Sequence, residues 1–249
     1  HSALDDETFE KIKALRRELH KIPELSGQER RTMEVLKTFL REHTSLSVTD
    51  RGGWFYALHQ ENGAEETVVF RADMDAIKGA GNIPYHGCGH DGHSAILAGL
   101  CLLTEGRVFQ KNLCFLFQPA EETGEGGNPC SRLLEELGAD RVYGYHNLPG
   151  YPLGTAVMRR ETFSCDTVNT PEITDMSRML FEQEGIPCLE AAAPFRWSED
   201  FGWYLKKCQG MYFGIGAGED CPDLHTPDYE FPDEVIRNAV RCLYLLAEI

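Results

Sequence analysis

Short apolar runs that lead directly into pairs of acidic residues recur along this chain and limit the folds open to it. Val-Val-Phe at residues 68–70 precedes Asp73 and Asp75, and a second run at residues 113–117 precedes a Glu-Glu pair. A short unbroken apolar run is typical of a strand covered on both faces. Segments with a helical period of about 3.6 residues separate these runs. The alternation predicts an α/β fold with a mixed, largely parallel sheet and helices on both faces.

The expected elements follow from apolar periodicity and from the turn-forming residues that bound it. Ser26 and Glu29 have the spacing of a capping box, which predicts that they begin the second helix. Helices are expected from just after Asp6 to just before Pro23, and around residues 33–40, 91–103, 133–137, 179–183 and 235–246. Strands are expected at residues 46–48, 54–58, 67–70, 113–117, 142–145 and 211–215.

Charge and cysteine content restrict the function classes. The formal net charge of the 249-residue chain is -16, which argues against nucleic acid or an anionic membrane as a partner. No apolar run has the length of a membrane span, and no signal-peptide pattern opens the chain. The nine cysteines are odd in number, and some lie in apolar periodic segments, which indicates a reducing compartment. Cytoplasmic localisation is therefore expected.

Residues 85–93 concentrate side chains that can bind a metal. This stretch, Tyr-His-Gly-Cys-Gly-His-Asp-Gly-His, contains Cys88, His90 and two further histidines, with glycines that let the backbone turn tightly. A thiolate and a neutral imidazole two residues apart can bind one zinc or similar ion if Gly89 bends the chain. A glycine loop around a buried cysteine is the alternative interpretation.

Six further acidic or histidine residues fall at or just after predicted strand ends: Asp73, Asp75, Glu121, Glu122, His146 and His225. Ligands of α/β sheets bind beyond the carboxyl ends of the strands. With the Cys-His motif, this set predicts two adjacent metal ions, which would lower the pKa of a bound water and stabilise a developing oxyanion. Within the Glu-Glu pair, one carboxylate would act as general base and the other as metal ligand. Two exposed acids on a loop are the alternative.

Taken together, these motifs resemble the successive signatures of the M20 metallopeptidases. The cysteine in Cys-Gly-His-Asp is similar to that of the amidohydrolase branch, which includes hippurate hydrolases, N-acyl-amino-acid deacylases and auxin-conjugate hydrolases. The resemblance covers nearly the whole chain and implies a zinc-exopeptidase-like catalytic domain. The motifs that carry it lie, in the family's order, at residues 70–76, 86–93, 117–122, 144–147, 198–201 and 224–227.

The resemblance also implies roles for individual residues. Glu121 matches the general base, and Asp75 matches the acid that orients a ligating imidazole. Five residues match the positions that bind two divalent ions (zinc, manganese, cobalt or nickel): Cys88, His90, Glu122, His146 and His225. Four more lie in the signatures without an implied role, and structural support explains them as well as catalysis does: Asp73, His86, His93 and Asp200.

Two departures from the family pattern bear on function. The segment 77–85 is shorter than the family's usual stretch, and an effect on substrate contacts is expected. The family also inserts a lid and dimerisation domain, on the order of a hundred residues, which is missing here near residues 165–170. Residues 1–249 are therefore expected to form a single catalytic domain in two sequence halves, 1–165 and 170–249. Because the family dimerises through the lid, a monomer is expected.

The leading hypothesis is a metal-dependent hydrolase that cleaves the amide bond of N-acyl amino acids or small amino-acid conjugates by a metal-activated water. Weak turnover is expected without the lid. A dipeptidase on the same fold is an alternative, which differs in whether the pocket accepts a free amino group. A metal-binding but inactive module is the other alternative, although such a module has no use for Glu121. Cys88 as a nucleophile explains the surrounding carboxylates less well than Cys88 as a metal ligand.

Overall fold

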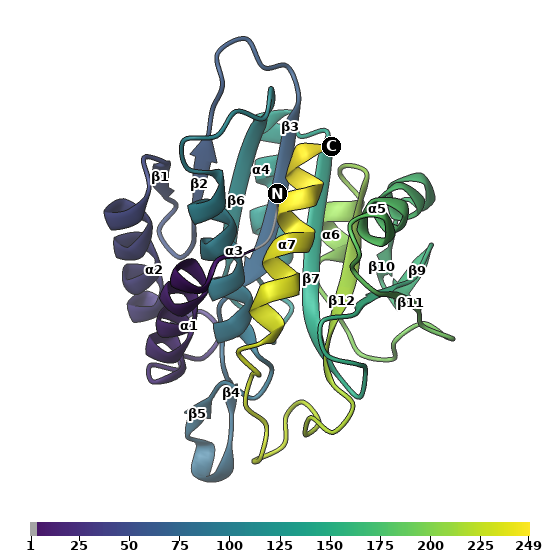
Figure 1. Ribbon diagram of the computed structural model, residues 1–249. Coiled ribbons are helices and arrows are strands. Elements are labelled where there is room, and N and C mark those ends of the chain that lie inside the picture. Colours follow the sequence, from purple (N-terminus) through teal and green to yellow (C-terminus); the bar gives the residue numbers. More distant parts are fainter. Residues whose placement is uncertain (1–3) are drawn as a thin grey trace.

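The computed structural model describes residues 4–249, which fold around one large sheet (Figure 1). Two short hairpins lie outside this sheet: β4 (Ile77–Lys78) with β5 (Pro84–Tyr85) around the 3-10 helix η1 (Ala80–Asn82), and β9 (Thr162–Ser164) with β10 (Thr167–Val168). In spatial order, the sheet strands within the described residues are β1 (Ser47–Asp50), β2 (Phe55–His59), β6 (Asn112–Gln118), β3 (Thr67–Asp73), β7 (Arg141–Pro149), β12 (Gly210–Gly218), β8 (Ala156–Met158) and β11 (Cys188–Glu190).

Parallel pairing dominates the centre of the sheet. β6, β3, β7 and β12 are parallel neighbours, with Phe70 of β3 opposite Phe115 of β6 and Tyr143 of β7. Antiparallel pairs occur toward both margins, where β2 joins β6 and β8 joins β12. The predicted mixed, largely parallel sheet is therefore confirmed. Because the four central strands end at the same edge, the segments that follow them lie side by side.

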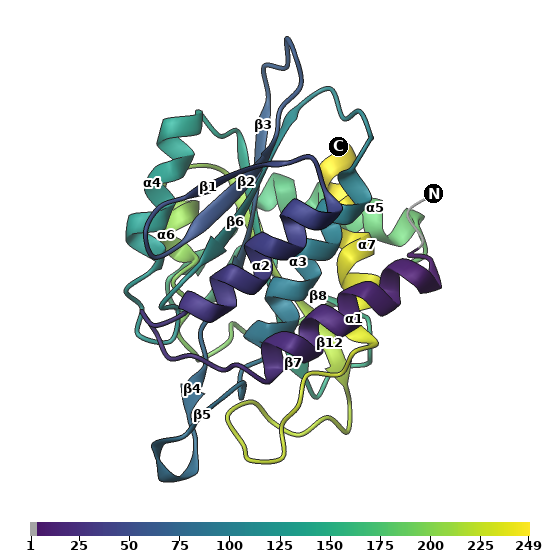
Figure 2. The same cartoon turned by 90° about the vertical axis from the view of Figure 1, so that its left-hand side faces the viewer.

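Helices cover both faces of the sheet, as predicted (Figure 2). Phe70 and Phe115 point into the larger core with α1, α3 and α7, whereas Val69 and Cys114 pack with α4 and α6. This alternation along each strand buries the sheet on both faces. One face carries α1 (Asp6–His20), α2 (Arg30–His43), α3 (His90–Thr104), α5 (Pro171–Gln183) and α7 (Val235–Glu248), and the other carries α4 (Gly127–Leu137) and α6 (Gly202–Leu205).

The predicted helices and strands are present, although their bounds differ. α4 begins at Gly127 and α5 at Pro171, well before the segments that the pattern identified, and β7 continues to Pro149. The pattern missed α6, the strands β8 to β11 and the β4–β5 hairpin. Elements of two to four residues contain too little periodicity to be detected.

The predicted capping box of α2 is wrong. Glu29 is the N-cap residue, but its side chain makes no capping hydrogen bond. Its carboxylate instead accepts from the backbone N–H of Ala120 at 2.8 Å, and Ser26 donates its hydroxyl to Asp75 at 2.6 Å. Partners far apart in the sequence, which local spacing does not reveal, have displaced the local ones. Both contacts connect the α1–α2 loop to the carboxyl edge of the sheet.

No helix among residues 4–249 has the length and apolarity needed to cross a membrane. The β9–β10 hairpin occupies the place where the sequence predicts the junction between two halves of the domain. Cys165 lies exposed at the tip of this hairpin.

Candidate metal centre

The loop between β5 and α3 carries the first two candidate ligands. Cys88 and His90 flank Gly89, whose φ of 88° lies in the left-handed region. A Cβ atom at residue 89 would lie 2.3 Å from Nδ2 of Asn147, so the turn requires glycine. The amide of Asn147 donates to the carbonyl oxygen of Cys88 at 2.9 Å, which holds the loop against β7. The bend at Gly89 that metal binding requires is therefore present.

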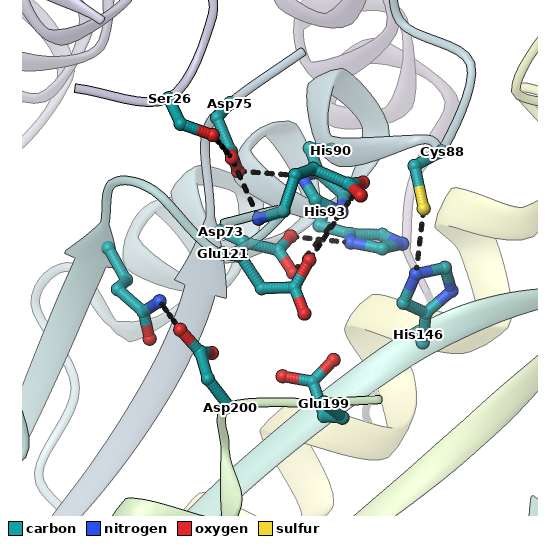
Figure 3. Close-up of polar contacts among 12 residues, drawn as sticks. Ser26, Asp73, Asp75, Cys88, His90, His93, Glu121, His146, Glu199 and Asp200 are labelled. Carbon is teal, nitrogen blue, oxygen red and sulfur yellow. Dashed lines mark hydrogen bonds and ion pairs between the residues drawn. The ribbon is translucent and has the colours of Figure 1, made fainter. Parts of the chain in front are cut away.

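The structure brings all five candidate ligands together at the carboxyl edge of the sheet. Figure 3 shows three of them, Cys88, His90 and His146. Cys88, His90 and His146 form one group, and Cys88, Glu122 and His225 form a second; within each group the ligand atoms lie within 4.8 Å of one another. Sγ of Cys88 is 3.4 Å from Nε2 of His146. Oε1 of Glu122 is 3.5 Å from Nε2 of His90 and 3.8 Å from Nε2 of His225. Because Cys88 belongs to both groups, the two groups are adjacent.

Two buried atoms in these groups have no hydrogen-bond partner among the described residues. They are Nε2 of His90 and Oε1 of Glu122. An unsatisfied buried polar atom costs about 1–3 kcal/mol, so these two atoms indicate a ligand that the chain itself does not supply. An imidazole nitrogen, a carboxylate oxygen and a nearby thiol are donors that zinc and similar ions bind. The residues therefore fit divalent cations.

Asp75 orients the imidazole of His90. Its Oδ1 is 3.0 Å from Nδ1 of His90, which leaves Nε2 directed at the other ligands. Its Oδ2 accepts from the Ser26 hydroxyl and, at 2.9 Å, from the backbone N–H of Glu122. Burial alone would raise the pKa of Asp75, but these hydrogen bonds hold the pKa below its usual value. An ionised carboxylate in this place increases the basicity of a ligating histidine.

His146 and His225 are held in different ways. Nδ1 of His146 is 2.7 Å from the carbonyl oxygen of Asn147, so Nε2 faces Cys88. Burial and the neighbouring His93 lower the pKa of His146 well below its usual value, which keeps the imidazole neutral, as metal ligation requires. His225 has a φ of 64°, and its N–H donates to the carbonyl of Gly87 at 2.7 Å. Left-handed backbone at a non-glycine residue is strained and is common at functional sites.

Glu121 lies beside the five ligands. Its Oε2 is 3.7 Å from Nε2 of His90, and its oxygens approach those of Asp73 and Glu199 within 4.8 Å. The carboxylates of Glu121 and Glu199 point into the same space in Figure 3. Burial first, and Glu199 second, raise the pKa of Glu121 well above its usual value. A carboxyl group with a raised pKa is suited to taking up a proton.

Comparisons with known proteins identify the family. A family model described as peptidase family M20/M25/M40 matches residues 69–249. The chain belongs to this family. An N-acetyldiaminopimelate deacetylase from Priestia megaterium is 32% identical over 169 residues, which cover 61% of this chain and 44% of that protein. A protein of the same name from Exiguobacterium sibiricum is 35% identical over 160 residues, with 58% and 43% covered.

The M20 chain thus spans about half the length of the curated relatives it matches. Its fold is also that of solved M20 structures. A dinuclear metal-binding peptidase of the family from Bacillus subtilis superposes with a TM-score of 0.88 at 18% identity, over 98% of this chain and 98% of that chain.

Of the four M20 signature residues without an implied role, three make structural contacts. Nδ1 of His93 is 2.7 Å from Asp73, while its Nε2 faces the amide and backbone N–H of Asn147. Asp200 accepts from Arg71 at 2.6 Å. These contacts join the strand ends beneath the ligands.

The fourth signature residue, His86, is buried, and neither of its ring nitrogens has a hydrogen bond within residues 4–249. Burial lowers the pKa of His86, so its imidazole is neutral. It lies outside the candidate ligand groups.

Sequence analysis missed an ionic network below the site. Arg71 is fully buried, and its guanidinium donates to Glu199 at 3.0 Å, to Asp200 at 2.6 Å and to Gln118 at 2.8 Å. Glu199 also accepts from the hydroxyl of Tyr212 at 2.7 Å. The sequence did contain a signal for this network, because Arg71 lies within an otherwise apolar strand. A charge buried on both faces of a sheet needs buried counter-charges.

The site opens into two cavities on the described surface. One has a volume of about 690 Å³ and the other about 610 Å³, and both include Glu122, Thr123 and His225 in their walls. The larger cavity extends from Glu121 along Trp197, whose ring lies 5.4 Å from that of His146. A substrate therefore has room on both sides of the ligand set.

Proposed function

We propose that this chain is the catalytic domain of a metal-dependent amidohydrolase that cleaves N-acyl amino acids or small amino-acid conjugates. The observation that carries the proposal is the placement of Glu121 against two ligand groups that share Cys88. A binding module has no need of an additional buried carboxylate at this point. The relatives named N-acetyldiaminopimelate deacetylases support an acylated amino acid as the substrate class.

Two divalent ions would be held by the five candidate ligands, with Cys88 common to both. Zinc, manganese, cobalt and nickel all accept this mixture of nitrogen, sulfur and oxygen donors. When bound, such a pair supplies Lewis acidity, which makes water a better nucleophile and polarises a carbonyl group.

Glu121 would accept the proton released by the attacking water and return it to the leaving nitrogen. Burial and Glu199 both favour its protonated form, which supports this uptake. Asp75 would keep Nδ1 of His90 protonated, so that Nε2 remains available to an ion. The aromatic wall at Trp197 would limit water on one side of the reacting bond.

We further propose that residues 1–165 and 170–249 are two sequence halves of one catalytic domain, with the family's lid missing at the β9–β10 hairpin. The exposed Cys165 supports this location, because an insertion there would not disturb the core. A lid-less chain is expected to be monomeric. A cytoplasmic location is consistent with the free cysteines and with the buried thiol at the site.

The test compares Glu121→Gln with Glu122→Gln after loading with manganese or zinc. Glu121→Gln should retain both ions and lose about two to four decades of N-acyl amino acid hydrolysis. Glu122→Gln should lose metal, measured by elemental analysis. Equal metal loss in the two variants would show that the roles of base and ligand are divided wrongly between Glu121 and Glu122. Hydrolysis of unblocked dipeptides in preference to N-acyl amino acids would instead favour the dipeptidase.

A further inference from the structure

The short helix α6 and its C-cap residue, Lys206, present two side chains to the larger cavity. On its inner side, Tyr204 is buried and donates its hydroxyl to Oε1 of Gln118 at 2.9 Å. Gly202 packs so closely that a Cβ atom there would lie 2.1 Å from the carbonyl oxygen of Asp166. On the cavity side lie Trp203 and Lys206, three residues apart and therefore on one face of the helical turn. The packing of α6 thus fixes the backbone that carries this pair.

Lys206 lies over the indole of Trp203. Its Nζ is 4.5 Å from the ring centroid, a cation–π distance. Trp203 is 38% exposed, so part of its indole is open to the cavity. Lys207 pairs with Glu135 at 2.8 Å, whereas Lys206 forms no ion pair with the residues that the structure describes. Lys206 is therefore oriented but electrically uncompensated.

The surroundings of Lys206 are otherwise acidic. Five carboxylates line the same cavity, and Lys206 is the one lysine or arginine among its described wall residues. A negatively charged part of a substrate would be repelled by these acids everywhere except near Lys206 and the bound ions. Because no carboxylate among residues 4–249 lies within 4.0 Å of its ammonium, Lys206 is free to pair with an anionic group of a substrate in this cavity.

We propose that Lys206 is a specificity-determining residue that binds a second carboxylate of the substrate, with Trp203 and Trp197 packing against the carbon chain between that carboxylate and the amide. The preferred substrates are then N-acyl amino acids with an anionic side chain. This inference rests on the proposed function, because it assigns the substrate class of the same site.

The test uses N-acetyl-L-glutamate and its neutral isostere N-acetyl-L-glutamine. The manganese-loaded chain should bind the glutamate compound more tightly, and Lys206→Met should weaken that binding about three- to tenfold while leaving the glutamine compound unchanged. The change should appear in KM, with kcat retained. Higher salt should reduce the preference, since exposed charges are screened. Lys207→Met removes the neighbouring charge outside the cavity and is the matched control.

Calorimetric titration in a Glu121→Gln background separates this inference from the proposed function, because binding is then measured without turnover. A chain that binds N-acetyl-L-glutamate through Lys206 but hydrolyses nothing would refute only the proposed function. Equal losses for both compounds in Lys206→Met, a similar loss in Lys207→Met, or no binding of either compound by the unmodified chain would overturn the role of Lys206. Lys78 lines the smaller cavity, and Lys78→Met should leave the preference for N-acetyl-L-glutamate intact. Loss of the preference in this variant would show that the anion binds in the smaller cavity and not at Lys206.

Discussion

Replacement of Arg71 by methionine tests the account of how the carboxyl edge of the sheet is held together. Arg71 is 0% exposed and donates to Glu199 and Asp200, with Asp73 a third carboxylate at 3.4 Å. Burial alone would lower the pKa of Arg71, but these three carboxylates raise it well above its usual value. Methionine fills a similar volume and leaves the buried carboxylates without their counter-charge.

Removal of one partner from a buried ion pair costs about 3–5 kcal/mol. Most domains have a stability of about 5–15 kcal/mol, so Arg71→Met should lose a large part of the total or fail to fold. Arg71→Lys keeps the charge but cannot reproduce the guanidinium contacts, and a smaller loss is expected. Arg160→Met breaks an exposed pair with Asp175 at 3.1 Å and should cost no more than about 1 kcal/mol.

The assay is urea unfolding of the purified variants, with the free energy of unfolding extrapolated to water. Adding Asp200→Asn to Arg71→Met should recover part of the loss, because one uncompensated charge is removed. If Arg71→Met unfolds with a free energy within about 1 kcal/mol of the unmodified chain, the network contributes little and the reasoning is refuted.

Three further predictions concern the metal centre, pH and assembly. The loaded chain should contain two ions, and Cys88→Ala, which affects both ligand groups, should lose at least one by elemental analysis; two retained ions would exclude a shared thiol. The hydrogen bond to Asp91 raises the pKa of His20 above 6.5. Protonated His20 therefore stabilises the folded chain below pH 6.5, and this stabilisation is lost as the pH rises through the folded-state pKa. The stability difference from His20→Asn should therefore shrink between acidic and alkaline pH, and urea unfolding that shows a constant difference would contradict this. Sedimentation should show a monomer, and steady-state assays should show turnover well below that of a chain with its lid restored; a dimer with rapid turnover would refute the missing-lid account.

Much of the fold was predictable because its signals are local. The apolar runs around Val69 and Leu116 predict buried strands, and amphipathic periodicity predicts the long helices. The acids that follow those strands lie at one edge of the sheet because parallel strands end at the same edge, independently of the loop conformations. Cys88 and His90 were recognisable by chemistry and by the glycine between them, which the left-handed backbone at Gly89 requires.

The partners of the ligands were decided by tertiary structure. Ser26 and Glu29 have the spacing of a helix cap, yet packing offers them Asp75 and the amide of Ala120, which are distant in sequence. Glu199 meets Glu121 only through long-range contacts, because Arg71 of β3 and the hydroxyl of Tyr212 on β12 both donate to its carboxylate. Local pattern identifies which side chains can bind a cation or move a proton. The distances at which they meet depend on long-range packing, which no window of the sequence contains.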